Sequence, residues 1–317
     1  MAEVRVGIVG CGGRGRGHMK VLHGFADVGL VAVCDPVAEG RERAAEEFGV
    51  EGRFSGVDEM LAAADLDAVV VATPAHLNAQ AALPCLERGV DTLLEKPPGM
   101  EIEETRALRD AAGRSGARGM VGWDRRFHPI ITQARERVEQ RGPIVQLMGE
   151  FHKSIHRFEQ SGRFPEVVMD NMLLESPIHC IDLLRALGGG EVVEVHSVVR
   201  RASSSYKDVH AALISFDNGC VAQLCANYTT DARLERYEIH GHGISAYLEG
   251  VRGGVVVCDG EQHALEPTQE SSTDVEDRYF IDCVKGRRPI ELPAANLDEA
   301  VKTMELAHAI LAGLREA

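Results

Sequence analysis

Short apolar runs alternate with helical patterns through residues 1–122, and this alternation restricts the fold more than any other feature of the chain. The apolar runs cover residues 4–9, 30–34, 68–72, 92–94 and 119–121. The helical patterns between them cover residues 14–25, 37–48, 57–64, 77–88 and 102–112. Strands this apolar, joined by helices, are typical of a parallel sheet covered on both faces. We therefore expect a doubly wound α/β domain over residues 1–122.

The pattern changes at Trp123, where we expect a second domain over residues 123–317. Helical patterns occur at residues 130–140, 178–187, 275–284 and 297–314. Strand-like runs lie at residues 192–200, 210–216, 221–228, 235–240, 246–249 and 255–258. Asp217-Asn218-Gly219 joins two of these runs and is typical of a hairpin turn. The second domain is therefore expected to be α+β, with a mostly antiparallel, open sheet.

Composition favours a two-domain globular protein and excludes several partners. A length of 317 residues, of which 44% are hydrophobic, exceeds one hydrophobic core of usual size. The chain carries 49 acidic and 34 basic side chains, a formal charge of -15, so we expect no nucleic-acid partner. The sequence contains no run of about 18 apolar residues, so we expect no membrane segment and a cytoplasmic protein.

The eight cysteines are scattered through apolar segments and form no CxxC pair. This spacing favours reduced, buried thiols over a disulfide framework. Cys220 and Cys225 are five positions apart in a strand-like run, so we expect their side chains to face opposite sides of a sheet. We therefore predict no metal site.

A glycine-rich turn lies between the first apolar run and the first helical pattern. Gly10-Cys11-Gly12-Gly13-Arg14-Gly15 matches the G-x-G-x-x-G pattern of dinucleotide-binding Rossmann domains. Gly10 permits the tight turn, Gly12 lets the backbone approach a pyrophosphate, and Gly15 allows close packing of helix on strand. Asp35 ends the second apolar run, where a carboxylate binds the adenosine ribose hydroxyls. We expect NAD as the cofactor, with NADP less favoured because the Asp35 carboxylate would repel a 2′-phosphate.

Glu95-Lys96-Pro97-Pro98 follows the apolar run at residues 92–94, at the carboxyl edge of the expected sheet, where ligands collect. The ammonium of Lys96 can there stabilise an alkoxide or polarise a carbonyl. A lysine in a loop is more often solvated, so its position alone does not assign this role. The prolines restrict the backbone of Lys96 and allow a cis bond.

The motifs occur in a fixed order, which is the glycine turn, Asp35, Thr73-Pro74, Glu95-Lys96-Pro97, Arg125-Arg126-Phe127-His128-Pro129 and His179-x-x-Asp182. This order resembles the Gfo/Idh/MocA family of nicotinamide-dependent oxidoreductases over nearly the whole chain. The resemblance implies a Rossmann domain and a hydride passed between a sugar or cyclitol carbon and C4 of the nicotinamide. It also implies a catalytic group that contains Lys96, His179 and the carboxylate of Glu175.

The segment around His179 departs from the family pattern. The family usually has D-x-G-x-H-x-x-D, whereas this chain has Glu175-Ser176-Pro177-Ile178-His179-Cys180-Ile181-Asp182. Glu175 keeps the carboxylate but moves it by about an ångström or more. Ser176 as N-cap and Pro177 as first helical residue place His179 in the first helical turn. Alternatively, the helix begins near Met172 and Pro177 kinks it.

Further site residues are implied by the resemblance or by their position. The cofactor-binding candidates besides Asp35 are Gly10, Cys11, Gly12, Gly13, Arg14, Gly15, Thr73, Pro74, His76, Glu95 and Lys96. The substrate candidates are Lys96, Trp123, Arg126, His156, Arg163 and His179. Residues 152–163 form either a pocket lining or a solvated loop. Asp182 is expected to orient His179 or to bond the other domain. Family members often have His at Asn78 and Asn at Asp124, which leaves cofactor-edge contacts open.

Three functional hypotheses remain open. In the leading one, the protein is an NAD-dependent dehydrogenase of a sugar, sugar derivative or cyclitol. His179 takes the hydroxyl proton, Lys96 stabilises the alkoxide, and Glu175 tunes both. The alternatives are a redox-neutral NAD-using glycosidase and a catalytically inactive nucleotide-sensing regulatory protein. The resemblance also implies a homodimer or homotetramer packed through the open face of the second-domain sheet.

Overall fold

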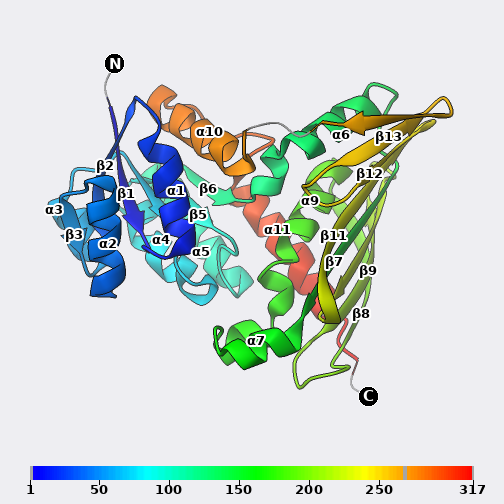
Figure 1. Ribbon diagram of the computed structural model, residues 1–317, viewed down its shortest axis with the longest axis horizontal. Helices are drawn as coiled ribbons and strands as arrows, with labels where there is room; N and C mark the ends of the chain where they lie inside the picture. The colour runs from blue at the N-terminus through cyan, green and yellow to red at the C-terminus, as the bar shows by residue number, and fades with distance from the viewer. Residues whose placement is uncertain (1–2, 267–269, 316–317) are drawn as a thin grey trace. The chain divides into compact units, whose positions relative to one another are not determined.

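The computed structural model describes residues 3–266 and 270–315, and the chain divides into two compact units (Figure 1). Unit 1 comprises Met1–Trp123 and Thr273–Val301, and unit 2 comprises Asp124–Ser272 and Lys302–Ala317. The first boundary thus falls after Trp123, and a segment near the C-terminus returns to unit 1. The functional roles that the sequence gives to residues 1–122 and 123–317 stay predictions.

Unit 1 is built on a seven-stranded sheet in the order β15-β6-β5-β4-β1-β2-β3. The strands are β1 (Val4–Val9), β2 (Val28–Cys34), β3 (Gly52–Phe54), β4 (Ala68–Val71), β5 (Asp91–Glu95), β6 (Gly119–Gly122) and β15 (Ala295–Asn296). Strands β1 to β6 pair in parallel, and β15 pairs antiparallel with β6. The order from β3 to β6 is that of a Rossmann sheet. The expected doubly wound fold is confirmed.

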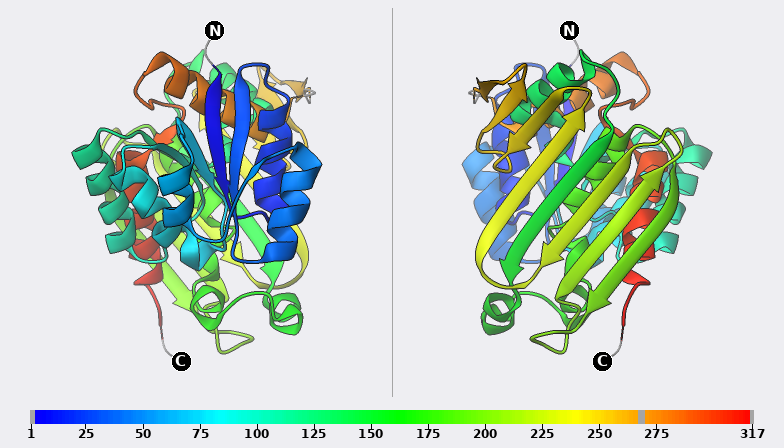
Figure 2. Two further views of the ribbon diagram at one scale, coloured as in Figure 1. Left: turned by 90° about the vertical axis from the view of Figure 1, so that its left-hand side faces the viewer. Right: turned by 90° about the vertical axis from the view of Figure 1, so that its right-hand side faces the viewer.

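Helices lie on both sides of this sheet (Figure 2, left). They are α1 (Gly13–His23), α2 (Ala38–Phe48), α3 (Val57–Ala63), the 3₁₀ helix η1 (Ala75–Leu77), α4 (Asn78–Glu87), α5 (Ile102–Ser115) and α10 (Ser272–Gly286). All four residues of the central strand β4 are buried. Burial on both faces explains why β4 is apolar at every position instead of alternating.

Unit 2 is built on an eight-stranded sheet in the order β14-β13-β12-β11-β7-β10-β9-β8 (Figure 2, right). The strands are β7 (Gln146–Ser154), β8 (Val192–Arg200), β9 (Val209–Phe216), β10 (Val221–Asn227), β11 (Thr229–Gly241), β12 (Ile244–Leu248), β13 (Gly254–Cys258) and β14 (Glu261–Leu265). Strands β7 and β10 pair in parallel, and the other neighbours pair antiparallel. The expected mostly antiparallel sheet is confirmed.

One face of the unit 2 sheet is packed and the other is open. The helices of this part of the chain are η2 (Asp124–Phe127), α6 (Pro129–Glu139), α7 (Ile155–Ser161), α8 (Glu166–Met169), η3 (Met172–Leu174), α9 (Ile178–Gly188) and α11 (Leu297–Leu311), which begins in unit 1. Helices α6 and α9 pack against the sheet. Along β9, Ala212 and Ile214 are buried while Leu213 between them is exposed, as expected of a half-buried strand.

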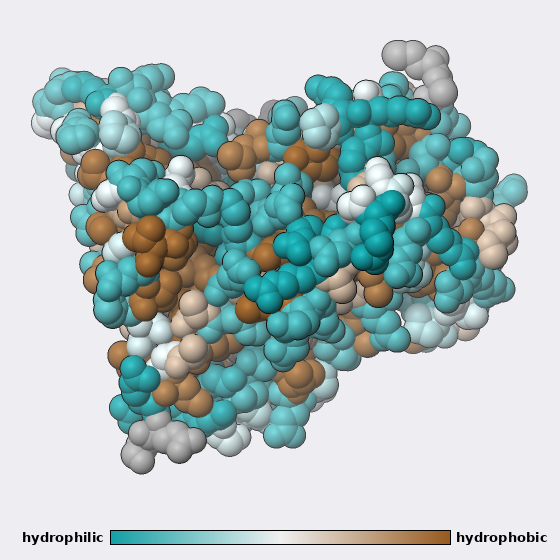
Figure 3. Space-filling model, turned by 180° about the vertical axis from the view of Figure 1, so that it is seen from behind, coloured by the Kyte–Doolittle hydropathy of each residue, from teal (hydrophilic) through white to brown (hydrophobic). Residues whose placement is uncertain are grey.

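The face of the molecule seen in Figure 3 is mainly hydrophilic, with hydrophobic residues gathered in separate patches. Exposed Cys225 and buried Cys220 fit the expectation that they face opposite ways.

Within residues 3–266 and 270–315, the helices are too short or too polar to span a membrane. The cytoplasmic location expected from the sequence stays a prediction.

Candidate active site

The glycine turn joins β1 to α1, and two of its glycines are required by the fold. Gly10 has a φ of +94°, and a Cβ there would lie 2.4 Å from the carbonyl oxygen of Ala72. A Cβ at Gly15 would lie 1.8 Å from the carbonyl oxygen of Gly10. A side chain at Gly15 would therefore push α1 away from the sheet.

Neither close packing nor a positive φ requires glycine at Gly12 or Gly13. A Cβ at either position would meet nothing within 4 Å, and Gly12 has a φ of −71°, which any residue adopts. The first turn of α1 contains no acidic residue, and no side chain caps its N-terminus. The free space and the uncapped N–H groups fit the phosphates of a dinucleotide.

Asp35 follows β2, and its carboxylate is fixed beside the glycine turn. The backbone N–H of Cys11 donates to Oδ2, and that of Val37 donates to Oδ1, both at 2.8 Å. The guanidinium of Arg41, on α2, donates to the carbonyl oxygen of Asp35 at 2.7 Å. The Arg41 guanidinium therefore contacts the backbone of Asp35 directly, although six positions separate the two residues in the sequence.

Lys96 follows β5 at the carboxyl edge of the same sheet, and its bond to Pro97 is cis. Asn78 is fully buried, and its Nδ2 donates to the carbonyl oxygens of Glu95 and Pro97, each at 3.0 Å. Thr73 donates to Asn78 Oδ1 at 2.8 Å. The backbone on both sides of Lys96 is therefore held by the first residue of α4, and Thr73 in the loop after β4 bonds that residue. The sequence leaves the role of Asn78 open, and in the structure this residue fixes the backbone around Lys96.

The Glu95 side chain lies in a buried ionic cluster. Its carboxylate accepts hydrogen bonds from Arg14 and, at 3.0 Å, from Nε2 of His18. The other ring nitrogen of His18 lies 2.8 Å from Asp277, on α10. Burial alone would raise the pKa of Glu95, but Arg14, His18 and Lys96 outweigh it and hold that pKa at about 2. His18 thus connects the carboxylates of Glu95 and Asp277, and Arg14 pairs with Glu95.

The charge state of His18 follows from the same cluster. Burial alone would lower the pKa of His18, but the carboxylates of Asp277 and Glu95 raise it to about 10. Neither His18 nor Asp277 is among the residues that the sequence singles out, because 259 positions separate them. The Arg14 side chain, expected at the cofactor, binds Glu95 and, at 3.2 Å, Thr273.

His179 lies in the first turn of α9, as expected, and is largely buried. Its Nδ1 is 3.5 Å from Oδ1 of Asp124, in η2. The helix has Pro177 as N-cap, and no side chain caps it. The expected Ser176 cap is therefore wrong, because the Ser176 hydroxyl instead bonds Glu175 and Lys153. The alternative start near Met172 is also wrong, because η3 is a separate 3₁₀ turn.

Glu175 is paired with a lysine at the end of β7. Its carboxylate lies 3.5 Å from Nζ of Lys153, which also lies over the rings of Phe151 and Phe158. Residues 152–163, for which the sequence allows a pocket lining or a solvated loop, comprise the end of β7, helix α7 and the two residues after it. This segment brings a cation to the carboxylate that precedes His179.

Asp182 has partners other than His179. Arg126 donates to both of its carboxylate oxygens, each at 2.7 Å, and Thr303 donates to it at 2.9 Å. Arg126 and Thr303 belong to unit 2, so the expectation that Asp182 bonds the other domain is wrong. The alternative expectation, that Asp182 orients His179, is not supported, because its carboxylate bonds Arg126 and Thr303. The Arg126 side chain is 1% exposed. Its expected contact with substrate is not supported by this geometry.

The other substrate candidates are dispersed. Trp123 is fully buried. His156 is exposed on α7 and lies 2.9 Å from Glu159, while Arg163 is exposed and lies over the ring of Phe164. His76 is half-buried in η1, and Pro74 before it is exposed. Substrate contacts by Trp123, His156 and Arg163, and cofactor contacts by His76 and Pro74, stay predictions.

Comparison with known proteins decides the family. Residues 4–123 match the domain described as "Oxidoreductase family, NAD-binding Rossmann fold". Residues 131–246 match the "GFO/IDH/MocA C-terminal domain". The chain belongs to the GFO/IDH/MocA oxidoreductase family. The resemblance seen in the sequence motifs is confirmed, and both domains of the family are present.

Three of the proteins similar to this chain are dehydrogenases by name. The chain is 36% identical to inositol 2-dehydrogenase of Rhizobium meliloti over 282 residues, 84% of this chain and 82% of that one. It is 27% identical to scyllo-inositol 2-dehydrogenase (NAD(+)) of Bacillus subtilis over 314 residues, 91% and 88% of the two chains. The structure of UDP-N-acetylglucosamine 3-dehydrogenase from Acidithiobacillus ferrooxidans has the same fold, with a TM-score of 0.84 and 24% identity over 99% of this chain and 98% of that one.

Proposed function

We propose that this GFO/IDH/MocA protein is an NAD-dependent dehydrogenase that transfers a hydride between a CH–OH carbon of a sugar, sugar derivative or cyclitol and C4 of the nicotinamide. The observation that carries the proposal is the carboxyl edge of the unit 1 sheet. There, an open glycine turn and a Lys96 held by Asn78 occur together. The relatives named for inositol and for UDP-N-acetylglucosamine support a polyhydroxylated substrate.

Each of the proposed site residues has a separate role in the reaction. A nicotinamide cofactor, held by the glycine turn and Asp35, would supply the acceptor for the hydride of the alcohol carbon. His179 accepts the hydroxyl proton, and the ammonium of Lys96 stabilises the negative charge that develops on the oxygen. Glu175 lies four residues before His179 and pairs with Lys153. This ion pair tunes the charge at the N-terminal end of the helix that carries His179. Asn78 keeps the Lys96 backbone in one place, which matters because small displacements of a catalytic group lower the rate.

NAD is proposed as the preferred cofactor. The Asp35 carboxylate lies beside the glycine turn and would repel a 2′-phosphate. Arg41 donates to the backbone oxygen of Asp35 and does not pair with its carboxylate. The negative charge of Asp35 therefore dominates this end of the site. The printed name of the Bacillus subtilis relative, which specifies NAD(+), agrees with this preference.

The two alternatives receive less support. The relatives described above are named dehydrogenases, which favours net oxidation or reduction over a redox-neutral glycosidase. Lys96 and His179 are both present, and a regulatory protein that only senses a nucleotide has no need of an acid–base pair.

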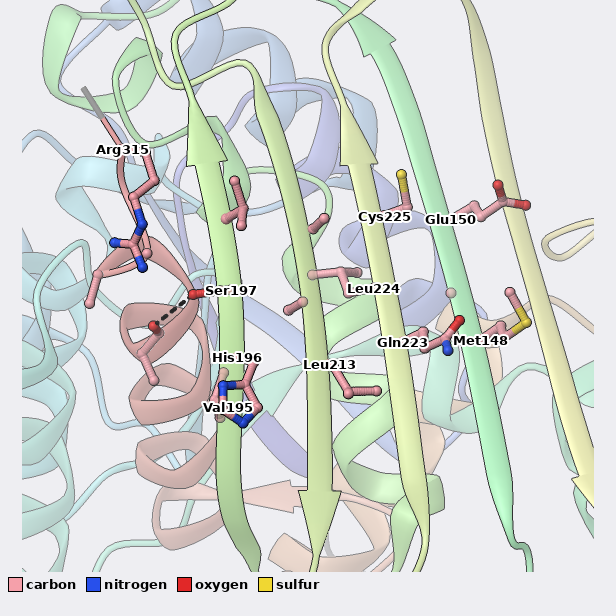
Figure 4. A pocket seen from close by; sticks show the side chains of 17 residues that line it. Met148, Glu150, Val195, His196, Ser197, Leu213, Gln223, Leu224, Cys225 and Arg315 are labelled. Carbon is pink, nitrogen blue, oxygen red and sulfur yellow. Dashed lines mark hydrogen bonds between the residues drawn. The ribbon is translucent and has the colours of Figure 1, made fainter. Parts of the chain in front are cut away.

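A second copy of the chain is the proposed partner of the open sheet face. A hollow of ≈ 840 Å³ lies over β7 to β10, with Leu213 and Val198 at its surface (Figure 4). These side chains are 43% and 48% exposed. Burying them would remove apolar surface from water in a homodimer or homotetramer. Leu213→Lys is expected to lower the mass seen by light scattering, and Leu292→Lys, in unit 1, is the control. An unchanged mass for both variants would contradict the assignment.

The dehydrogenase proposal is tested with a panel of inositols, aldoses, amino sugars, uronic acids and nucleotide sugars. Each is offered with NAD and with NADP, and the near-ultraviolet absorbance of the reduced nicotinamide is followed. Lys96→Met serves as the blank. A Lys96-dependent rise with NAD supports the proposal and identifies the substrate class. Release of a free sugar from a glycoside without net reduction of NAD would favour the glycosidase alternative.

A further inference from the structure

Asp124 lies beside His179, and we propose that it is the positioning residue that orients the His179 imidazole for proton transfer. The inference rests on the proposed function, in which His179 accepts the substrate proton. Nδ1 of His179 is 3.5 Å from Oδ1 of Asp124, and the two side chains are 11% and 9% exposed. Both belong to unit 2, so this relationship lies within one compact unit.

The position of the carboxylate decides which ring nitrogen can act as a base. A carboxylate beside Nδ1 favours the tautomer with its proton on Nδ1, and the lone pair is then on Nε2. Nε2 is thereby prepared to accept a proton from a hydroxyl. A separation of 3.5 Å is longer than a hydrogen bond, but catalytic hydrogen bonds often shorten when substrate is in place.

Asp124 is itself held rigidly. Arg125 donates to both of its carboxylate oxygens, at 2.9 and 3.0 Å, and the hydroxyl of Ser272 donates to Oδ2 at 3.0 Å. Glu235, on β11, accepts two hydrogen bonds from Arg125, at 2.8 and 3.2 Å, and one from Tyr237 at 3.0 Å. The carboxylate therefore has a fixed direction, and Arg125 balances its charge. A carboxylate with these partners can hold an imidazole in one orientation.

The other carboxylates near His179 in the sequence have partners of their own. Asp182 is bonded to Arg126 and Thr303. Glu175 is bonded to Ser176 and paired with Lys153. Asp124 is 55 residues before His179, so no helical or strand spacing indicates the pair. The structure assigns the orienting role to a residue of η2 and not to the helix that carries His179.

The first test measures the imidazole directly, without activity. The full chain is labelled with ¹³C in the histidine rings, and the His179 signal is assigned by its loss in His179→Gln. We expect Asp124→Asn to move the midpoint of the His179 titration to lower pH by about one unit, because a nearby negative charge favours the protonated ring. Asp259→Asn, at an exposed carboxylate of unit 2 that pairs with Arg141, is the control and is expected to leave the midpoint in place. Equal midpoints in wild type and Asp124→Asn would overturn the proposal.

The second test uses the reaction. Asp124→Asn is expected to lower kcat by about 100-fold while KM changes little, and to move the acid limb of the pH profile in the same direction as the ring titration. If the ring titration shifts but no substrate turns over even in wild type, Asp124 is positioned as proposed and the dehydrogenase assignment fails. If wild type turns over but Asp124→Asn matches it in kcat and pH profile, the positioning role fails.

A second variant covers the case in which Asp124→Asn does not fold. Arg125→Gln combined with Glu235→Gln removes both charges of one buried ion pair and leaves the Asp124 carboxylate in place. Asp124 then loses its counter-ion, so the midpoint of the His179 titration is expected to rise. Folding of each variant is checked by circular dichroism. A midpoint that stays constant in the double variant would overturn the proposal.

Discussion

The imidazole of His18 lies 3.0 Å from the carboxylate of Glu95, although 77 residues separate them. The other side of the ring lies against Asp277. One buried histidine thus connects the helix after the glycine turn, the residue before Lys96 and helix α10. This arrangement ties the expected cofactor-binding and catalytic elements of unit 1 to a segment that returns from the C-terminal part of the chain.

His18 should make the stability of the protein fall at high pH. Its pKa is raised from the ordinary value of 6.5 to about 10. The stabilisation is therefore complete below about pH 6.5 and lost as the pH rises through 10, at a slope on the order of 1 kcal/mol per pH unit. Urea unfolding at several pH values measures how the free energy of unfolding changes with pH. His18→Gln is expected to be less stable at neutral pH by about 3 kcal/mol and to show a flatter pH dependence.

The exposed His263, on β14, provides the control for this prediction. His263→Gln should keep the pH dependence of wild type, because its side chain is 43% exposed and lies 3.9 Å from Glu261. If His18→Gln and wild type lost stability in parallel between pH 7 and 10, the charged His18 would not be the cause.

Two glycines of the same turn should respond differently to alanine. Gly15→Ala places a Cβ against the carbonyl of Gly10 and is expected to lower the free energy of unfolding by about 1–3 kcal/mol or more. Gly12→Ala meets no protein atom within 4 Å and should change stability by less than about 0.5 kcal/mol. Calorimetric titration of Gly12→Ala should nevertheless show a Kd for NAD raised at least about tenfold. Unchanged binding by this variant would mean that the phosphates lie elsewhere.

Replacing Asp35 should shift the choice of cofactor. Asp35→Ser removes the carboxylate that would bind the ribose hydroxyls, and the loss of hydrogen bonds to a charged group is expected to lower kcat/KM for NAD by about 10- to 100-fold. The kcat/KM for NADP should rise, because the repulsion of its 2′-phosphate is removed and Arg41 is close by. Steady-state rates with both cofactors check this. A ratio of NAD to NADP efficiency equal to that of wild type would exclude Asp35 from cofactor selection.

His210, on β9, should make the protein sensitive to acid. Burial lowers the pKa of His210 to about 4 from 6.5. The unfolded chain therefore takes up a proton before the folded one does, and stability is lost as the pH falls from about 6.5 to about 4, by up to about 3 kcal/mol. His210→Leu should remove this part of the acid sensitivity in denaturant titrations. His196→Leu, at an exposed position on β8, should behave as wild type; parallel curves for all three proteins would contradict the assignment.

Local patterns predict the strands and helices of unit 1 well, and they fail where a strand is short, polar or interrupted. Edge strand β3 has three residues, and β14 is largely exposed. Strand β7 lies in the middle of its sheet, yet its bounds are hard to see in the sequence because Gly149 interrupts it and its exposed side is polar. A Cβ at Gly149 would lie 2.3 Å from Sγ of Cys180. This glycine therefore permits close packing of α9, whereas in a sequence it weakens a strand prediction.

The partners of the site residues depend on tertiary structure. The sequence indicates Lys96, His179 and the glycine turn because their motifs are local. The ion pair of Arg126 with Asp182 spans 56 residues, and the contact of His179 with Asp124 spans 55. No helical or strand period relates residues so far apart. The sequence alone therefore favours Asp182, one turn from His179, either as the residue that orients His179 or as a bond to the other domain. The fold instead gives each of them a partner in η2.

Deuterium transfer tests the assignment as a dehydrogenase most directly. A substrate identified with the panel is deuterated at its oxidised carbon, and the mass of the reduced cofactor is measured after turnover. We predict that the deuterium appears at C4 of the nicotinamide, and that Lys96→Met and His179→Ala each slow the transfer by about 100-fold or more. Product formed with no deuterium in the reduced cofactor, or transfer at the wild-type rate in both variants, would contradict the proposed reaction and its residues.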